Sequence, residues 1–368
     1  MIRSFAKQFI LSFVLSGLVI LSFLYFKKSF RFTQSQIISP LPFTSPQPSA
    51  TPTLAPNQPI NLASVLEYVG TPAEQNVKID PQTEIVLVAT GDIIPARSVN
   101  NKVTNLNDFT YPYLNTVNLL READITFVNL ESPLIPNCPA TVEGMVFCGN
   151  QNNVLGLTYA GIDIVSIANN HAGNHGFEGI QQTIYLLHTH VVLTTGSGSA
   201  AVKVVKGLRF GFLGYNDIGT PEKGIAWADI PTIQKQVAEL KQQVDFVIVT
   251  YHWGTEYKHN PDQRQIDLAH ATIDAGADRI IGNHPHWVQG LEIYKNKFIT
   301  YAHGNFVFDQ MWSRETTEGV VGMYIFNANG LKDVHFYPIV IENYSQPRFA
   351  TVVEAKKILN DMRIATKY

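Results

Sequence analysis

One pattern recurs between Glu84 and Gln310: an acidic residue, a short apolar run and then an abrupt polar cluster. The runs read EIVLVATGD, DITFVNLE, DIVSIANNH, DFVIVTYHWG and DRIIGNHPH. Their length and apolar character are typical of strands buried on both faces. Helical patterns lie between them, and one has apolar residues four, three and four positions apart, at Ile233, Val237, Leu240 and Val244. This alternation predicts a layered α/β domain with largely parallel strands.

The same pattern gathers polar side chains at one edge of the predicted sheet. In open α/β sheets the ligand crevice forms beyond the carboxyl ends of the strands, and the polar clusters stand at such ends. They supply Asp92, Glu131, Asn169, Asn170, His171, His252, Glu256, His284 and His286. The acidic residues that precede strands belong to the opposite edge, and we interpret them as turn and strand-start residues: Asp124, Asp163, Asp245 and Asp278.

Carboxylates, an amide oxygen and imidazoles form a ligand set suited to divalent zinc, manganese or iron. The edge therefore predicts a site for one or two ions, which would activate water and neutralise charge on phosphoryl or carbonyl oxygens. Within it, His284 and His286 flank Pro285 after a strand, and strand alternation would turn both imidazoles to one side. Alone this His-x-His pattern is weak, because histidines also bind backbone carbonyls; the other clusters give it weight.

The N-terminal segment predicts a membrane anchor. Phe9 to Phe26 is 18 residues long, free of charge and bounded by basic residues, so a helix of roughly 27 Å would cross a bilayer at ~1.5 Å per residue. A cleaved signal peptide is the alternative, but no small-residue cleavage site follows the apolar run. We predict an anchor over residues 1–31, a Pro/Ser/Thr-rich linker over 32–60 and a main domain over 61–368.

Two features favour a single-pass protein of the cell membrane whose main domain lies outside the cytoplasm. The prolines of the linker favour an extended stalk. Cys138 and Cys148 are the only cysteines and close a short loop that a disulfide would staple, although two cysteines alone prove no bridge. The net charge of −3 and the lack of a long basic run argue against a nucleic-acid partner.

Six blocks, in order, resemble the signatures of the CapA family, also called bacterial capsule synthesis or poly-γ-glutamate synthesis proteins: ATGDIIPAR, VNLESPL, SIANNHAGNHG, TYHWGTEY, GNHPHWVQG and YAHGNFVFDQ. The resemblance covers residues 85–310. The family is similar to calcineurin-like metallophosphoesterases, which implies a four-layer α/β/β/α sandwich with a metal site at the sheet edge. After these blocks, residues 319–344 alternate apolar and polar around the turn NANG, which predicts added C-terminal antiparallel strands.

Matched residue by residue, the resemblance implies six metal ligands, with Glu131 as a bridging carboxylate: Asp92, Glu131, Asn170, His252, His284 and His286. It also implies that His171 is catalytic, stabilising charge or giving a proton to a leaving group. We expect Asn169, Glu256 and Asn305 to line the pocket. Arg97 either holds an anionic substrate as a catalytic group or pairs with Glu131.

Two positions depart from the pattern. Ile94 stands where phosphoesterases usually have a histidine, and Asn174 stands where the family block usually has an aspartate, which removes a carboxylate partner for His171.

The resemblance implies a metal-dependent, hydrolase-like protein that acts in synthesis or export of an anionic capsule or envelope polymer, such as poly-γ-glutamate, beside membrane subunits of a synthase. Two alternatives stay open: a non-catalytic polymer-binding or scaffold subunit, and a phosphomonoester or phosphodiester phosphatase unrelated to capsule.

Overall fold

The computed structural model describes residues 57–68, 70–74 and 77–366. The predicted anchor and most of the predicted linker lie outside these residues, and the predicted boundaries between the three parts stay predictions. Among the helices that are described, none has both the length and the apolar character that a bilayer crossing requires.

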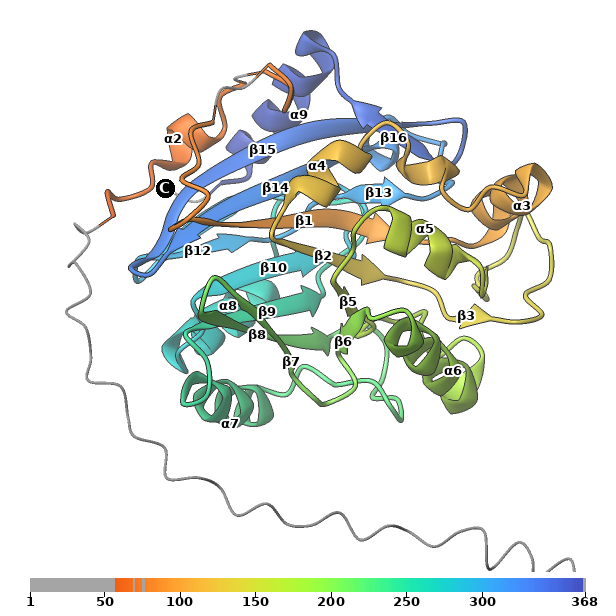
Figure 1. Cartoon of the computed structure of the whole chain (residues 1–368), viewed down its shortest axis with the longest axis horizontal. Helices are drawn as coiled ribbons and strands as arrows, with labels where there is room; N and C mark the ends of the chain where they lie inside the picture. The colour runs from red at the N-terminus through yellow and green to blue at the C-terminus, as the bar shows by residue number, and fades with distance from the viewer. Residues whose placement is uncertain (1–56, 69, 75–76, 367–368) are drawn as a thin grey trace, which may run out of the picture. The chain divides into compact units, whose positions relative to one another are not determined.

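The first of two large β-sheets carries the strands of the N-terminal and C-terminal segments (Figure 1). Its strands are β1 (Ile85–Ile93), β2 (Ile125–Leu130), β5 (Ile164–Ser166), β6 (Leu193–Thr195), β13 (Asn305–Val307), β14 (Glu318–Asn327), β15 (Gly330–Glu342) and β16 (Gln346–Phe349). They lie in the order β16-β15-β14-β1-β2-β5-β6, and β13 pairs with the end of β1. β1, β2, β5 and β6 are parallel, whereas β14, β15 and β16 form the predicted antiparallel addition.

The second sheet comes from the middle of the chain. It consists of β7 (Ala201–Val205), β8 (Leu208–Asn216), β9 (Phe246–His252), β10 (Arg279–Asn283), β11 (Leu291–Tyr294) and β12 (Lys297–Thr300). The order is β11-β12-β10-β9-β8-β7, and its four central strands are parallel. A separate short pair joins β3 (Leu134–Ile135) and β4 (Gly149–Asn150).

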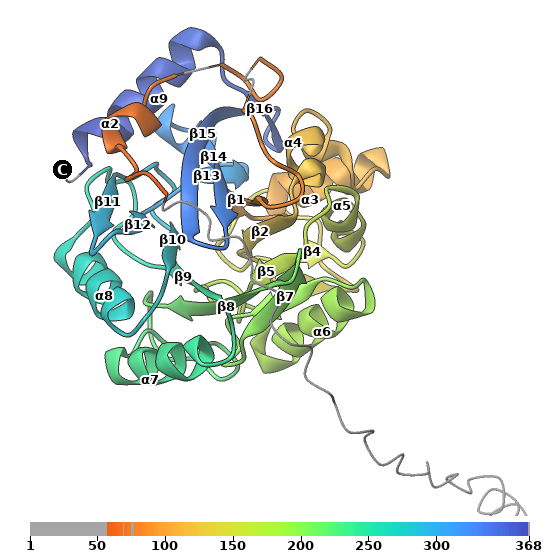
Figure 2. The ribbon, with the colours of Figure 1, turned by 60° about the vertical axis from the view of Figure 1, so that its left-hand side comes forward.

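Helices cover the outer faces of both sheets (Figure 2). Against the first sheet lie α3 (Arg97–Leu106), α4 (Val117–Glu122), α5 (Asn153–Tyr159) and α6 (Gly176–Thr189); against the second lie α7 (Ile230–Lys241) and α8 (Gln263–Asp274). The remaining helical segments are α2 (Leu62–Val65), α9 (Val352–Ile364), η1 (Tyr111–Tyr113) and η2 (Glu315–Thr317). The sequence sets the start of α8 through a capping box, in which Asp262 and Gln265 satisfy each other's backbone amides.

The core has three apolar layers because the central strands are buried on both faces. In β1, Val86 and Val88 point toward the helices of the first sheet, while Leu87 and Ala89 point toward the second sheet. A third layer packs α7 and α8 on the outer face of the second sheet. Two sheets between two helical layers are the α/β/β/α arrangement that was predicted.

The aspartates that precede strands have the structural role that was expected. Each accepts a backbone N–H from the strand beside its own: Asp124 from Val86, Asp163 from Thr126, Asp245 from Arg209 and Asp278 from Val247, at 2.7–2.9 Å. Each also pairs with a lysine or arginine. These carboxylates therefore hold the starts of neighbouring strands together, at the edge opposite the polar clusters.

Candidate metal centre

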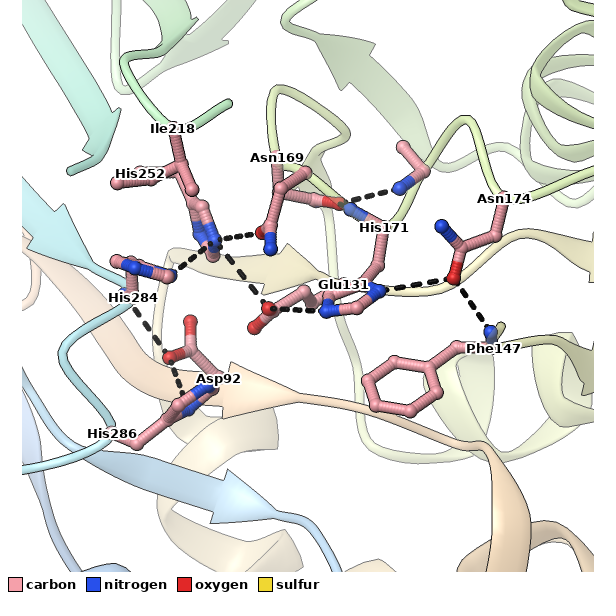
Figure 3. Close-up of polar contacts among 12 residues, drawn as sticks. Asp92, Glu131, Phe147, Asn169, His171, Asn174, Ile218, His252, His284 and His286 are labelled. Atoms are coloured by element: carbon pink, nitrogen blue, oxygen red, sulfur yellow. Dashed lines mark hydrogen bonds and ion pairs between the residues drawn. The ribbon is translucent and has the colours of Figure 1, made fainter. Parts of the chain in front are cut away.

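The predicted polar clusters meet where the carboxyl ends of both sheets face each other (Figure 3). The first sheet supplies Asp92 at the end of β1, Glu131 directly after β2, and the loop that follows β5. The second supplies His252 at the end of β9 and the loop that follows β10. Two overlapping sets of side chains could each hold an ion, because within each set the ligand atoms lie within 4.8 Å of one another. The sets are Glu131, His284 and His286, and Asp92, Glu131 and His252.

Glu131 is the member that both sets share. Its side chain is fully buried, and no hydrogen bond from the described residues reaches either carboxylate oxygen. Burial, and next the charge of Asp92, raise the pKa of Glu131 well above its ordinary value. A buried carboxylate without hydrogen-bond donors is costly to a fold unless a cation compensates it, so the donor set fits a divalent ion.

Asp92 is held in place by its neighbours. The side-chain amide of Asn129 donates to Asp92 Oδ1 at 2.7 Å, and the backbone N–H of His284 donates to Oδ2 at 3.1 Å. Asn129 lies within β2 and was not among the predicted site residues. An asparagine inside the apolar run ITFVNL is the signal that would have found it, because a buried amide requires partners.

The three predicted histidine ligands lie next to one another. His252 Nε2 is 3.0 Å from His284 Nδ1 and 3.4 Å from Glu131 Oε1, while His286 Nδ1 is 3.6 Å from Asp92 Oδ2. Burial lowers the pKa of His252 to about 3 and that of His284 well below its ordinary value. Both imidazoles are therefore neutral near pH 7, which is the form that binds metals.

The backbone brings His284 and His286 together in a way that the sequence interpretation did not foresee. Strand β10 ends at Asn283, and both histidines have left-handed backbone angles, with φ of 99° and 56°. Strand alternation is therefore the wrong reason for their common direction. Non-glycine residues in this region carry strain that surrounding structure must offset, and such strain clusters at functional sites.

The other predicted residues surround this group. Asn170 Oδ1 lies 2.7 Å from His252 Nε2, and Asn305 Oδ1 lies 2.9 Å from His286 Nδ1. Asn169 accepts the backbone N–H of Ala172 at 2.8 Å and so shapes the loop after β5. Glu256 is half-buried and close enough for its charge to raise the pKa of Glu131.

His171 stands at the side of the site, with Nε2 4.0 Å from Glu131 Oε1. Its Nδ1 lies 3.0 Å from the side-chain oxygen of Asn174, so the aspartate-to-asparagine departure leaves a hydrogen-bond partner in place. Burial lowers the pKa of His171 to about 4. Position 174 therefore keeps a contact with His171 through the amide oxygen of Asn174, and what is missing is the charge of the expected carboxylate.

Arg97 does not pair with Glu131, as one of the two interpretations had it. Its guanidinium forms an ion pair with Asp309, whose other oxygen accepts the N–H of Ser98 at 3.0 Å. The same guanidinium lies over the rings of Phe147 and Phe308, at 4.9 and 5.0 Å from their centroids. Asp309 therefore already neutralises the positive charge with which Arg97 was predicted to hold an anionic substrate.

Cys138 and Cys148 are joined by a disulfide, with Cα atoms 5.7 Å apart. The bridge closes the loop that leads from the β3 region to Phe147, beside His171. No free cysteine occurs among the described residues.

Comparison with known proteins agrees with the resemblance of the sequence blocks. The family model described as "Bacterial capsule synthesis protein PGA_cap" matches residues 86–310. The capsule biosynthesis protein CapA of Bacillus anthracis is 28% identical, over 79% of this chain and 76% of its own. The PGA biosynthesis protein CapA of Bacillus subtilis is 30% identical, over 77% of this chain and 79% of its own. A probable polyglutamine synthesis accessory protein of Mycobacterium tuberculosis is 27% identical, over 60% and 66%.

Proposed function

The chain belongs to the family of bacterial capsule synthesis proteins, and from that membership we propose that it acts in the synthesis or export of an anionic envelope polymer such as poly-γ-glutamate. The names of two relatives refer to capsule and PGA biosynthesis. The buried group of carboxylates and histidines is the chemistry that this chain offers for work on such a polymer.

A divalent metal centre is the second part of the proposal, and the observation that carries it is the buried carboxylate of Glu131, which accepts no hydrogen bond from the described residues. Asp92, Glu131, Asn170, His252, His284 and His286 would hold one or two ions. When bound, zinc, manganese or iron would supply a Lewis acid for cleavage of a phosphoester, amide or acyl bond.

The chain's own residues would orient the reacting groups and handle the proton. His171 is neutral near pH 7, and its Nε2 faces the site from a distance of 4.0 Å to Glu131. From this position it would exchange a proton with a nucleophile or a leaving group. Asn170 and Asn305 would fix the rings of His252 and His286 through the contacts of 2.7 and 2.9 Å.

We also propose that the main domain works outside the cytoplasm, held by the predicted anchor near membrane subunits of a synthase. The bridge between Cys138 and Cys148 supports this location, because disulfides persist in oxidising compartments. A protease added to intact cells tests it: cleavage of the main domain is expected, and full protection until the membrane is opened would contradict the proposal.

Metal analysis of the purified full chain tests the metal centre. We expect about one or two equivalents of zinc, manganese or iron in the native protein and loss of metal from His284→Ala. His188→Ala is the matched control, because His188 lies on α6 and contacts Thr194 of β6, away from the site, and should keep the native metal content. A native content in His284→Ala would overturn the ligand assignment.

Two observations favour a second candidate, a non-catalytic accessory subunit. Ile94 is fully buried at the position where a metal-binding imidazole was expected, and one relative carries the name of an accessory protein. Replacing His171 by alanine in cells separates the two accounts. If the site is catalytic, polymer production should fall in His171→Ala. If the chain is an accessory subunit, production should persist in His171→Ala and be lost only when the whole protein is deleted.

A further inference from the structure

The disulfide-closed loop reaches the predicted catalytic histidine through Phe147. The rings of Phe147 and His171 are stacked, with centroids 4.1 Å apart and planes 25° apart. Phe147 is 1% exposed, and its second aromatic neighbour is Phe308, 5.9 Å away in an edge-on arrangement. One face of the imidazole is thus covered by a side chain that nothing in the predicted site had included.

Asn174 connects the same loop to the nitrogen of His171 that faces away from the site. Its side-chain oxygen accepts the backbone N–H of Phe147 at 2.6 Å and lies 3.0 Å from His171 Nδ1. Because an N–H donor requires an oxygen, Phe147 fixes which end of the Asn174 amide points inward. That oxygen only accepts hydrogen bonds, so Nδ1 of His171 must carry the proton and Nε2 is left with its lone pair toward Glu131.

The loop itself is tied down at both ends and in the middle. The disulfide joins Cys138 to Cys148, the residue after Phe147. Between them, Thr141 O accepts from the Asn101 side chain at 2.9 Å, and Gly144 O accepts from Arg97 Nη1 at 3.2 Å. Arg97 also covers the ring of Phe147, and its ion pair with Asp309 keeps it there. The bridge and the two side chains from α3 therefore restrict the motion of Phe147.

We propose that Phe147 and Asn174 are positioning residues, which hold His171 as the Nδ1-protonated tautomer with Nε2 directed at the metal centre, and that the disulfide loop exists to place them. The inference rests on the proposed function in that it gives His171 a task. Pre-organisation of a proton-transferring group removes the need to order it during reaction. In this chain the covalent loop supplies that order where the family usually has a carboxylate at position 174.

The experiment reads the tautomer directly and needs neither metal nor substrate. In the metal-free full chain, labelled with ¹⁵N-histidine in detergent micelles, the two ring nitrogens of His171 give separate signals, which His171→Gln identifies. The native chain should show Nδ1 protonated. Asn174→Ala and the paired change Cys138→Ser with Cys148→Ser should both give a mixture of tautomers, whereas Asn174→Asp keeps an acceptor and should retain the native pattern.

Phe147 is tested by two variants that differ in aromatic character. Phe147→Leu removes the stacked ring and should give a mobile His171 with mixed tautomers, while Phe147→Tyr retains the ring and should restore the native signal. A single Nδ1-protonated tautomer in Asn174→Ala, in Phe147→Leu and in the cysteine pair would overturn the proposal. If these variants lose the tautomer but every variant of His171 leaves polymer production intact, the positioning is real and the catalytic role of His171 is wrong.

Discussion

His252 of the second sheet lies with Nε2 3.4 Å from Oε1 of Glu131 in the first sheet, across the junction of the two sheets. Both side chains are fully buried, and the burial raises the pKa of the acid while it lowers the pKa of the base. Burial therefore disfavours the charged form of each group unless a cation is present. Removal of either group should change how the protein responds to metal and to pH.

Glu131→Gln should remove most of the bound metal, by at least about tenfold, because the shared ligand loses its charge while its shape is kept. It should also change the stability of the chelated protein. The pKa of Glu131 is higher in the folded chain than in the unfolded chain. Its contribution to the stability of the metal-free protein is therefore full below the unfolded pKa near 4.5 and is lost as the pH rises. Thermal unfolding with a chelator from pH 5 to 9 should show a weaker decline in Glu131→Gln; an identical decline would contradict the assignment.

Asn129→Ala should weaken metal binding about 10–100-fold, although Asn129 is not itself a predicted ligand. Its amide donates to Asp92 at 2.7 Å and lies 3.2 Å from His252 Nδ1, so it orients one ligand from each sheet. Competition with a coloured chelator measures the affinity. Asn216→Ala is a suitable control, since Asn216 is also a buried strand-end asparagine but contacts the backbone of Ile218 instead.

Asp163→Ala should lower the free energy of unfolding by about 1–3 kcal/mol, since the buried N–H of Thr126 would lose its acceptor. Metal content should stay native, because Asp163 lies at the opposite edge of the sheet. Denaturant unfolding of the chelated protein measures the first effect and metal analysis the second. Asp163→Asn keeps an acceptor oxygen and should cost less; a loss of metal in either variant would show that the two edges are coupled.

His303→Gln should reduce the acid sensitivity of the chelated protein. Burial lowers the pKa of His303 to about 3, and its Nε2 lies 2.8 Å from the Tyr324 hydroxyl. A depressed folded pKa means that the stability is fully present above the unfolded value near 6.5 and is lost as pH falls toward 3. Each such group contributes at most about 1.4 kcal/mol per pH unit. Unfolding curves at pH 4.5, 5.5 and 6.5 should show a shallower slope in the variant.

Much of this arrangement could be predicted from the sequence, because buried parallel strands and strand-end clusters leave strong signals. The apolar runs before Asp92, Glu131 and His252 form β1, β2 and β9, as expected. Strand β8, between β9 and β7 in the second sheet, was missed: its segment LRFGFLGYN contains glycines, and no polar cluster of the predicted site follows it. Its pairing with β9 is set by tertiary contacts, which local pattern does not encode, whereas β7 is its hairpin partner across the two-residue turn Lys206-Gly207.

The contacts among site residues were harder to predict than their identities. One of the two interpretations of Arg97 paired it with Glu131, whereas Asp309, more than two hundred positions away in the chain, takes the ion pair instead. The stack of Phe147 on His171 depends on a loop whose path is set by the disulfide and by two hydrogen bonds from α3. Such contacts depend on three-dimensional proximity, and no spacing rule in a single sequence reports them.

Because the predicted ligands are divided between two sheets, a bound ion would also link the sheets to each other. Asp92, Glu131 and Asn170 come from the strands of one sheet or the loops that follow them, and His252, His284 and His286 come from the strands of the other or the loops that follow them. A metal bound by both sets would cross-link the two sheets at one end of the core between them, since separating the sheets there would break coordination bonds. Binding and removal of the ion would then change how firmly the two sheets are held together at this end of the core.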